Sequence, residues 1–155
     1  MSLEALDELY KEVILDHYQN PRNSKPLQQV SVTTEGYNPV CGDQIKLQIL
    51  VHDGAIEALA VLGKGCAISQ AAASMMTEAV KGKTVEEAEA LARTFRDFMT
   101  DDKVEPDSLG DLEVLEGVRK FPVRIKCATL SWNTLQEALK EHRQGLKEGR
   151  VVIKD

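Results

Sequence analysis

The strict alternation of apolar and polar residues at 45–51 constrains the fold of this chain more than any other feature. The apolar positions of this segment are Ile45, Leu47, Ile49 and Val51. Their two-residue period is that of a strand with one buried face. An Asp53-Gly54 turn and an apolar run at 56–62 follow, which predicts a hairpin. With another alternating segment at 30–34, the pattern predicts a three-stranded antiparallel sheet.

Helices are expected to cover the buried face of this sheet. Apolar spacing and composition predict helices at 3–18, 67–80, 84–99, 112–118 and 128–146, with a loop at 101–110. Asn20-Pro21 ends the first helix, and Thr84 with Glu87 forms a capping box that opens the third. A helix, three strands and then only helices predict an α+β sandwich in a single domain, residues 1–155.

Charge and cysteine count restrict the partners and the compartment. The chain has 19 Lys and Arg against 25 Asp and Glu, and its net charge of -6 repels nucleic-acid phosphates and anionic lipids. No apolar stretch is long enough to span a bilayer, and no basic leader precedes one. Three cysteines cannot all pair with one another, so a reducing compartment suits them. We therefore expect a cytoplasmic protein that binds neither nucleic acid nor membrane.

Cys41 lies in a loop between two predicted strands, with Pro39 on one side and Gly42 on the other. Proline restricts the backbone and glycine frees it, so the loop can point the thiol outward. Asp43 is two residues further on, and in an extended segment both side chains project to one face and can reach one ion. The alternative is a simple turn in which Asp43 bonds only local backbone amides.

The other two cysteines are expected at the starts of helices. Cys66 directly precedes the alanine-rich helix, and Cys127 directly precedes the last long helix. Unpaired amides and the helix dipole favour a thiolate there, and Arg124 and Lys126 add positive charge beside Cys127. In the alternative interpretation both cysteines are small hydrophobic residues at capped junctions, and the two basic residues are solvated.

Three thiolates and a carboxylate form a closed tetrahedral ligand set that suits zinc, and sulfur-rich ligation also suits iron-sulfur chemistry. The candidate ligands are Cys41, Asp43, Cys66 and Cys127. They are far apart in the chain and include no Cys-x-x-Cys pair. Spacing alone therefore leaves the metal site undecided.

Four segments together are specific for one family. They are Asp-His-Tyr-Gln-Asn-Pro-Arg-Asn at 16–23, Asn-Pro-Val-Cys-Gly-Asp at 38–43, Gly-Cys-Ala-Ile-Ser at 65–69, and the third cysteine, Cys127. Their combination resembles the IscU-like iron-sulfur scaffold family, and within it the SufU-type branch. The resemblance spans nearly the whole chain. It implies a SufE/IscU-like α+β sandwich with the three cysteines and Asp43 gathered at one end.

Two departures from the classical scaffolds favour the SufU-type branch. Lys126 occupies the position where classical scaffolds carry a histidine before the third cysteine. The spacer between Cys66 and Cys127 is also longer, with the additional residues expected within 103–118. Members of this branch resemble zinc-dependent sulfur acceptors for a cysteine desulfurase more than platforms for building clusters.

The resemblance implies a zinc-dependent sulfurtransferase in iron-sulfur cluster assembly. Zinc would be held by the four candidate ligands, and Cys41 would leave the ion to accept persulfide sulfur from a SufS-type, pyridoxal-phosphate-dependent desulfurase. Arg124 and Lys126 would stabilise charge on the sulfurs, and downstream iron-sulfur assembly proteins would receive the product.

Two alternatives to sulfur transfer stay open. The first is a scaffold on which a transient iron-sulfur cluster forms on the same ligands and is passed to apo-proteins. The second is a structural zinc protein without chemistry.

The remaining candidate residues are assigned no catalytic role. His17 is expected to be a packed or capping residue on the first helix, and His52 and His142 have no evident partner in the sequence. Met75 and Met76 are expected in the core. Neither a glycine-rich phosphate loop nor a serine nucleophile elbow occurs in the sequence.

Overall fold

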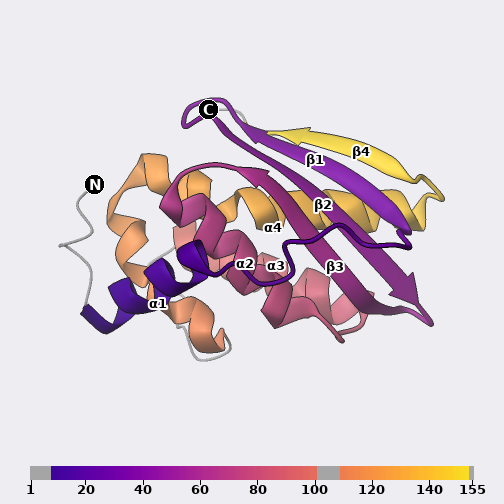
Figure 1. The fold of residues 1–155 in the computed structure, drawn as a ribbon, viewed down its shortest axis with the longest axis horizontal. Coiled ribbons are helices and arrows are strands. Elements are labelled where there is room, and N and C mark those ends of the chain that lie inside the picture. The colour runs from indigo at the N-terminus through magenta and orange to yellow at the C-terminus, as the bar shows by residue number, and fades with distance from the viewer. Residues whose placement is uncertain (1–7, 101–108, 154–155) are drawn as a thin grey trace.

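A four-stranded sheet forms one layer of the molecule, and helices cover one of its faces (Figure 1). The structure is a computed structural model that describes residues 8–100 and 109–153. Its elements in chain order are α1 (Glu8–Gln19), β1 (Val32–Asn38), β2 (Asp43–His52), β3 (Ala55–Lys64), α2 (Ala67–Val80), α3 (Val85–Thr100), the 3-10 helix η3 (Gly110–Lys120), α4 (Pro122–Arg143) and β4 (Glu148–Val152). The α+β class predicted from the sequence is confirmed.

The central strands follow the alternating pattern of the sequence. Ile45, Leu47 and Ile49 of β2 are buried, as their period predicts. A register shift at Leu50/Val51 interrupts the pairing with β3, and Val51, at the end of the alternating segment, is only half-buried. The turn to β3 has positive φ at both Asp53 (52°) and Gly54 (75°), the conformation of a type I′ hairpin turn.

The sheet has a fourth strand that the sequence did not predict. Its order is β3-β2-β1-β4, with antiparallel pairs except for β4, which is parallel to β1. The prediction of three strands in a purely antiparallel sheet was therefore wrong. No residue of β4 is fully buried. Its alternate residues Gly149 and Val151 are half-buried and the others are exposed. The strand pairs with β1 through its backbone, and one apolar side chain on the inward side of five residues leaves little periodic signal.

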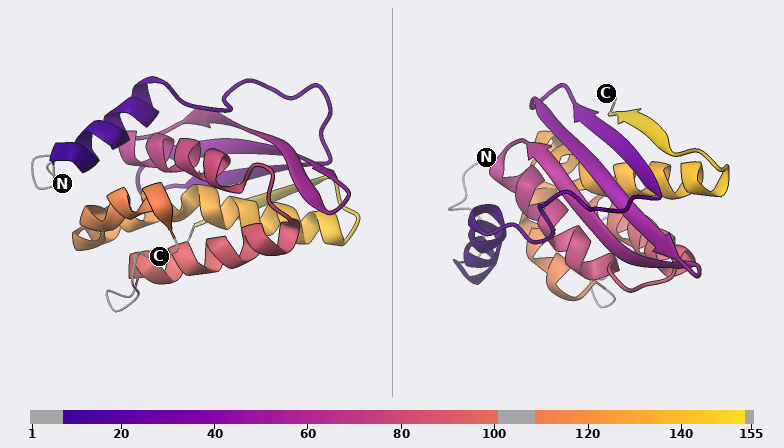
Figure 2. Two further views of the ribbon diagram at one scale, coloured as in Figure 1. Left: turned by 90° about the horizontal axis from the view of Figure 1, so that it is seen from below. Right: turned by 45° about the vertical axis from the view of Figure 1, so that its right-hand side comes forward.

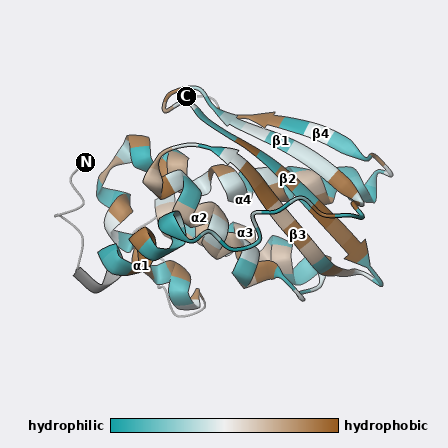
Figure 3. Cartoon of the chain, viewed as in Figure 1, coloured by the Kyte–Doolittle hydropathy of each residue, from teal (hydrophilic) through white to brown (hydrophobic). Residues whose placement is uncertain are grey.

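The helices form two layers on the sheet. α4 contacts β1 and β2, and α2 contacts β3. α3 packs against α4 on the side away from the sheet (Figure 2), where Phe95 stacks on Trp132 with ring centroids 5.2 Å apart. α1 packs against α2 and carries both hydrophilic and hydrophobic segments (Figure 3), as expected of an amphipathic surface helix.

α2 confirms its predicted bounds, 67–80. It lies against β3, α1 and α4, so most of its small residues are buried, and Met75 and Met76 belong to the core as predicted. The predicted capping box is also present: the Glu87 amide donates to Thr84 Oγ1 and the Thr84 amide donates to Glu87 Oε1. Local sequence signals therefore placed these two helix starts correctly.

The last helix starts earlier than predicted. α4 begins at Pro122 and ends at Arg143, whereas the sequence predicted 128–146. Proline is compatible with the first turn of a helix because the amide hydrogen it lacks has no partner there. Pro122 therefore both ends η3 and opens α4, and Cys127 lies inside the helix rather than before it.

Two predicted segments fall partly outside the described residues. Residues 3–7 of the first predicted helix lie outside them, and so does nearly all of the predicted loop at 101–110. The short helix predicted at 112–118 is present as η3, which also occupies part of the long spacer between Cys66 and Cys127. Within residues 8–100 and 109–153, no helix has the length and apolar character that a membrane span requires.

Candidate metal centre

Three of the four predicted ligands meet at one end of the sheet. The ligand atoms of Cys41, Asp43 and Cys127 all lie within 4.8 Å of one another. Cys41 comes from the turn between β1 and β2, Asp43 is the first residue of β2, and Cys127 comes from α4. Zinc bonds of about 2.0–2.3 Å allow two ligands of one ion to be up to about 4.6 Å apart. Two thiols and a carboxylate at this spacing fit a divalent metal ion.

Cys66 lies beside this group, although its thiol is not within 4.8 Å of all three other ligand atoms. It caps α2: its sulfur accepts a hydrogen bond from the Ser69 amide at 3.4 Å. Its own amide donates to Asp43 Oδ1 at 3.0 Å, and its thiol is hydrogen-bonded to that of Cys127. Cys66 is therefore in contact with two members of the group, Asp43 and Cys127.

The two linked thiols ionise very differently. The hydrogen bond from Cys127 lowers the pKa of Cys66 to about 6, and the Ser69 amide acts in the same direction against burial. The same hydrogen bond and burial raise the pKa of Cys127. Of this pair, Cys66 consequently loses its proton before Cys127 does.

Cys127 does not occupy the position predicted for it. The expectation that it precedes a helix, where amides would favour its thiolate, was wrong because α4 begins at Pro122. Its sulfur instead lies 3.1 Å from that of Cys41 and 3.7 Å from the Val123 carbonyl oxygen, and the residue is fully buried. Inside the helix its own backbone amide is already paired, so the dipole of the helix start does not act on it.

Arg124 faces the sulfurs. Burial alone would lower its pKa, but the contact with the Cys127 thiol and the charges of the three cysteines raise it. The structure therefore places one of the two predicted supporting cations in contact with the site. Lys126 is half-buried in α4 beside Cys127, and its predicted role at the sulfurs stays a prediction.

Two further residues shape the site, and neither was assigned a role from the sequence. The side-chain amide of Asn38 donates to Asp43 Oδ2 at 3.3 Å and approaches Cys127 Sγ at 3.7 Å. Gly65 leaves space for Asp43, because it has no Cβ atom. A Cβ atom at this position would lie 2.6 Å from Asp43 Oδ1 and 3.0 Å from Ser69 Oγ. The sequence carries a signal for Asn38: residues two apart in a strand share one face, so Asn38 lies on the same inward face as Val32, Thr34 and Gly36. A polar residue is unusual at such a position.

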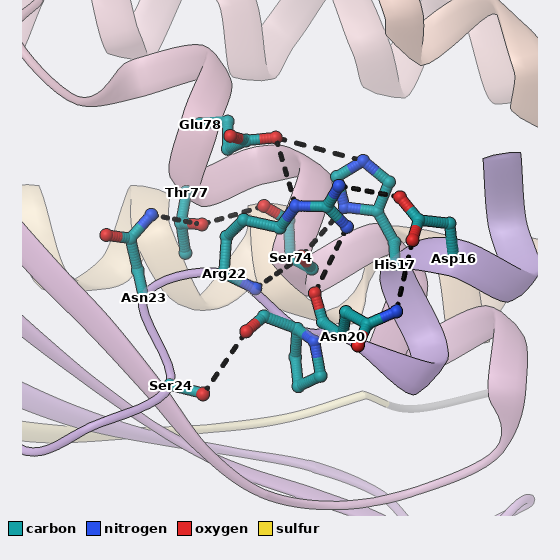
Figure 4. A network of polar contacts seen from close by, with 10 residues as sticks. Asp16, His17, Asn20, Arg22, Asn23, Ser24, Ser74, Thr77 and Glu78 are labelled. Carbon is teal, nitrogen blue, oxygen red and sulfur yellow. Dashed lines mark hydrogen bonds and ion pairs between the residues drawn. The ribbon is translucent and has the colours of Figure 1, made fainter.

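The histidines lie outside the group of ligands. His17 is buried, and its Nδ1 lies 2.8 Å from Ser74 Oγ of α2 (Figure 4). This confirms the prediction that it is a packed residue. His52 is exposed and lies 3.3 Å from Asp53 in the hairpin turn, a partner not expected from the sequence.

The chain matches a family model over most of its length. Residues 9–148 match the family described as NifU-like N terminal domain. The chain is 46% identical over 150 residues to the zinc-dependent sulfurtransferase SufU of Bacillus subtilis, covering 94% of this chain and 99% of that protein. It is 42% identical over 160 residues to the iron-sulfur cluster assembly scaffold protein IscU of Streptococcus pyogenes, covering 98% of this chain and all of that protein.

Solved structures share this fold. An iron-sulfur cluster assembly scaffold protein for the SUF system from Fervidobacterium islandicum superposes with a TM-score of 0.81 at 30% identity, covering 90% of this chain and 99% of that chain. The N-terminal part of a NifU-like protein from Brucella abortus superposes with a TM-score of 0.80 at 21% identity, covering 92% of this chain and 99% of that chain. The second likeness supports the fold alone.

Proposed function

Because the chain belongs to the NifU-like N-terminal domain family, whose members include iron-sulfur cluster assembly proteins, we propose that it accepts persulfide sulfur from a cysteine desulfurase at Cys41. The observation that carries the proposal is the convergence of Cys41, Asp43 and Cys127. The Cys66 amide donates a hydrogen bond to Asp43, and the Cys66 thiol contacts Cys127. The name of the Bacillus subtilis relative, a zinc-dependent sulfurtransferase, supports this reading over other sulfur chemistry.

Zinc is the metal we propose for the site. Cys41, Asp43, Cys66 and Cys127 would hold it, because three sulfurs and a carboxylate oxygen form a ligand set that zinc favours. Bound zinc would keep the thiols ionised and protect them from oxidation. The protein supplies the arrangement: both oxygens of Asp43 already accept hydrogen bonds, from Cys66 and from Asn38.

Cys41 is the best acceptor because its backbone is the least constrained of the three. It lies in a turn beside Gly42, whose φ is 72°, and it is only partly buried, next to the half-exposed Val40. Cys66 is tied to the start of α2 and Cys127 is buried within α4. A turn can carry a sulfur outward towards a partner more easily than a helix can.

The transfer step is a thiol exchange that conserves electrons. The Cys41 thiolate attacks the terminal sulfur of the desulfurase persulfide, a new sulfur-sulfur bond forms on Cys41, and the bond within the donor persulfide breaks. The desulfurase cysteine leaves as a thiolate. Arg124, already in contact with Cys127, would stabilise negative charge among the sulfurs, and Lys126 would add a second positive charge.

Cys41→Ala tests the proposal directly. We expect the variant to fold and to lose its acceleration of sulfide release by the cognate desulfurase, because the acceptor sulfur is absent. Sulfide release would be measured with and without this protein, before and after zinc removal by a chelator. Val40→Ala, a change at the exposed neighbouring position, is the matched control and should leave the acceleration intact. Full acceleration by Cys41→Ala would show that Cys41 is not the acceptor.

A cluster scaffold is the second candidate function. The IscU relative, 42% identical to this chain, is named an assembly scaffold, and sulfur-rich ligands also hold iron-sulfur clusters. Zinc bound in a one-to-one ratio without cluster colour would favour sulfur transfer. Anaerobic reconstitution of a transferable cluster would favour scaffolding. Thiols that do not react with a persulfide donor would favour a purely structural zinc site.

The cellular setting belongs to the same proposal. We place the protein in the cytoplasm as one domain, with a SufS-type desulfurase as donor and downstream iron-sulfur assembly proteins as recipients. The full-length match to the SufU relative supports these assignments.

A further inference from the structure

Asn38 is a polar residue at a position where the sheet faces its core. The inward positions of β1 are Val32, Thr34, Gly36 and Asn38, and all are buried. Asn38 has no exposed surface, and within the described residues its Oδ1 atom has no hydrogen-bond partner. An unpaired buried oxygen is unfavourable for folding, and an apolar side chain would not bring that cost. The residue therefore calls for an explanation beyond packing.

The contacts of the Asn38 side-chain nitrogen explain why a polar residue lies at this buried position. Its Nδ2 atom donates to Asp43 Oδ2 at 3.3 Å and lies 3.7 Å from Cys127 Sγ. The opposite orientation of the amide would place its oxygen against a carboxylate oxygen and a sulfur, so the nitrogen faces two acceptors for an electrostatic reason. One side chain thereby contacts ligands from two elements, β2 and α4.

Asp43 depends on this contact for its orientation. Its Oδ1 atom accepts the Cys66 amide at 3.0 Å, and Asn38 binds Oδ2. With one donor on each oxygen, the carboxylate plane cannot rotate freely. With Asn38 removed, the hydrogen bond from the Cys66 amide would remain, but the link through Asn38 from Asp43 to Cys127 would be lost.

We propose that Asn38 is a positioning residue of the metal centre, whose single amide holds Asp43 and Cys127 in place while Cys41 exchanges between metal and partner. This rests on the proposed function, because it assumes that these residues bind a metal. Groups that hydrogen-bond to metal ligands fix their orientation, and losing one such group typically weakens metal binding roughly 10- to 100-fold.

The test uses the full chain and metal binding alone. In Asn38→Leu, which is similar in size and has no donor, we expect zinc affinity measured by chelator competition to fall by roughly 10-fold or more. The visible absorption bands of bound Co²⁺ should also shift, because the geometry around the ion changes. Thr34→Val is the matched control: it removes another buried donor from β1, which bonds Glu141 Oε1 at 2.8 Å. It should lower stability while leaving zinc affinity and the Co²⁺ spectrum unchanged.

The outcomes separate this inference from the proposed function. Wild-type zinc affinity and an unaltered Co²⁺ spectrum in Asn38→Leu would overturn the role of Asn38, whatever the desulfurase assay shows. If the leucine variant does not fold, Asn38→Ser serves in its place, because the serine side chain is too short to bridge both ligands. We expect the same loss of zinc affinity and the same shift of the Co²⁺ spectrum in this variant. If Cys41→Ala still accelerates the desulfurase but Asn38→Leu binds zinc weakly, sulfur transfer fails and the positioning role stands.

Discussion

Asp43 shows how much of this site depends on single residues. It is 1% exposed, and its two oxygens accept one hydrogen bond from the Cys66 amide and one from Asn38. The Cys66 amide can approach because Gly65 has no Cβ atom in the space that Asp43 occupies. A buried polar group needs such partners, because burial without hydrogen bonds is unfavourable. Glycine at 65 is thus a condition for the hydrogen-bonded position of Asp43.

Gly65→Ala should weaken metal binding. Gly65 does not have a positive φ, so alanine is compatible with its backbone. The new methyl group, however, would lie 2.6 Å from Asp43 Oδ1 and displace the carboxylate. We expect zinc affinity by chelator competition to fall roughly 10-fold. Gly54→Ala is the control: with φ at 75° and open space around it, it should cost about 1 kcal/mol of stability and leave zinc affinity unchanged. Equal zinc affinity in both variants would contradict this explanation.

At the scale of elements, the segment after α1 fastens that helix to the rest of the molecule. The Arg22 amide and the His17 ring both contact Ser74 Oγ, and the Arg22 guanidinium binds Asp16 (Figure 4). Asn23 continues the attachment: its side chain donates to Thr77 Oγ1, and its carbonyl accepts the amide of Val61 in β3. The segment at 16–23, found as a family motif, therefore joins α1, α2 and the edge of the sheet, and it lies outside the group of candidate ligands Cys41, Asp43 and Cys127.

The attachment of α1 should weaken in acid through His17. Burial and the nearby Arg22 lower the pKa of His17, against the opposing effect of Glu78, Asp16 and Asp111. At pH values below 6.5, the ordinary pKa of histidine, His17 binds a proton more readily in the unfolded chain than in the folded chain. The free energy of unfolding should therefore fall as the pH is lowered.

Urea unfolding at a series of pH values between 7.5 and 5, in about half-unit steps, would measure this slope. His17→Asn keeps a group able to bond Ser74 but cannot titrate, so the slope should flatten. His52→Gln is the matched control, because His52 is an exposed histidine, and its slope should equal that of the wild type. Identical slopes in all three proteins would exclude His17 as the cause.

At the scale of the whole molecule, α4 connects the site to the far edge of the sheet. Its Cys127 lies at the candidate metal centre, while its Glu141 is buried and accepts a hydrogen bond from Thr34 of β1 at 2.8 Å. The Glu141 carboxylate also occupies the space where a side chain at position 149 of β4 would lie, so Gly149 permits the parallel strand to approach. One carboxylate of α4 thereby lies against two strands, β1 and β4.

Glu141→Gln should stabilise the protein at neutral pH. Burial raises the pKa of Glu141 above its ordinary 4.5, although the Thr34 hydrogen bond opposes this. The folded state therefore resists the charged form, and this cost is present at neutral pH and disappears as the pH falls towards 4.5. Glutamine can still accept the Thr34 hydrogen bond without the charge.

Urea midpoints at pH 7.5 and 5 would test this expectation. The gain of Glu141→Gln over the wild type should be larger at pH 7.5 than at pH 5. Glu148→Gln, at an exposed position of β4, is the control and should change stability little at either pH. A variant that is less stable than the wild type at pH 7.5 would show that the buried charge is favourable here.

The sequence alone determined the features that depend on neighbouring residues. The alternation in β2, the Asp53-Gly54 turn, the bounds of α2 and the Thr84–Glu87 cap follow from local periodicity, turn geometry and backbone capping. These signals need no knowledge of distant contacts, which is why they could be predicted. The identity of the candidate ligands also followed from the sequence, through the family's motifs rather than through spacing.

Which distant groups meet depends on how the elements pack against one another. β4 pairs with β1 through its backbone, and only Gly149 and Val151 are half-buried, so the segment was too short and too exposed to show a periodic pattern. Cys127 approaches Cys41 because α4 packs closely on β1, where Gly36 leaves room for Thr134. The partners of Asn38 and Gly65 likewise come from other elements. Such contacts are set by the packing of elements against one another, and packing depends on the whole chain at once.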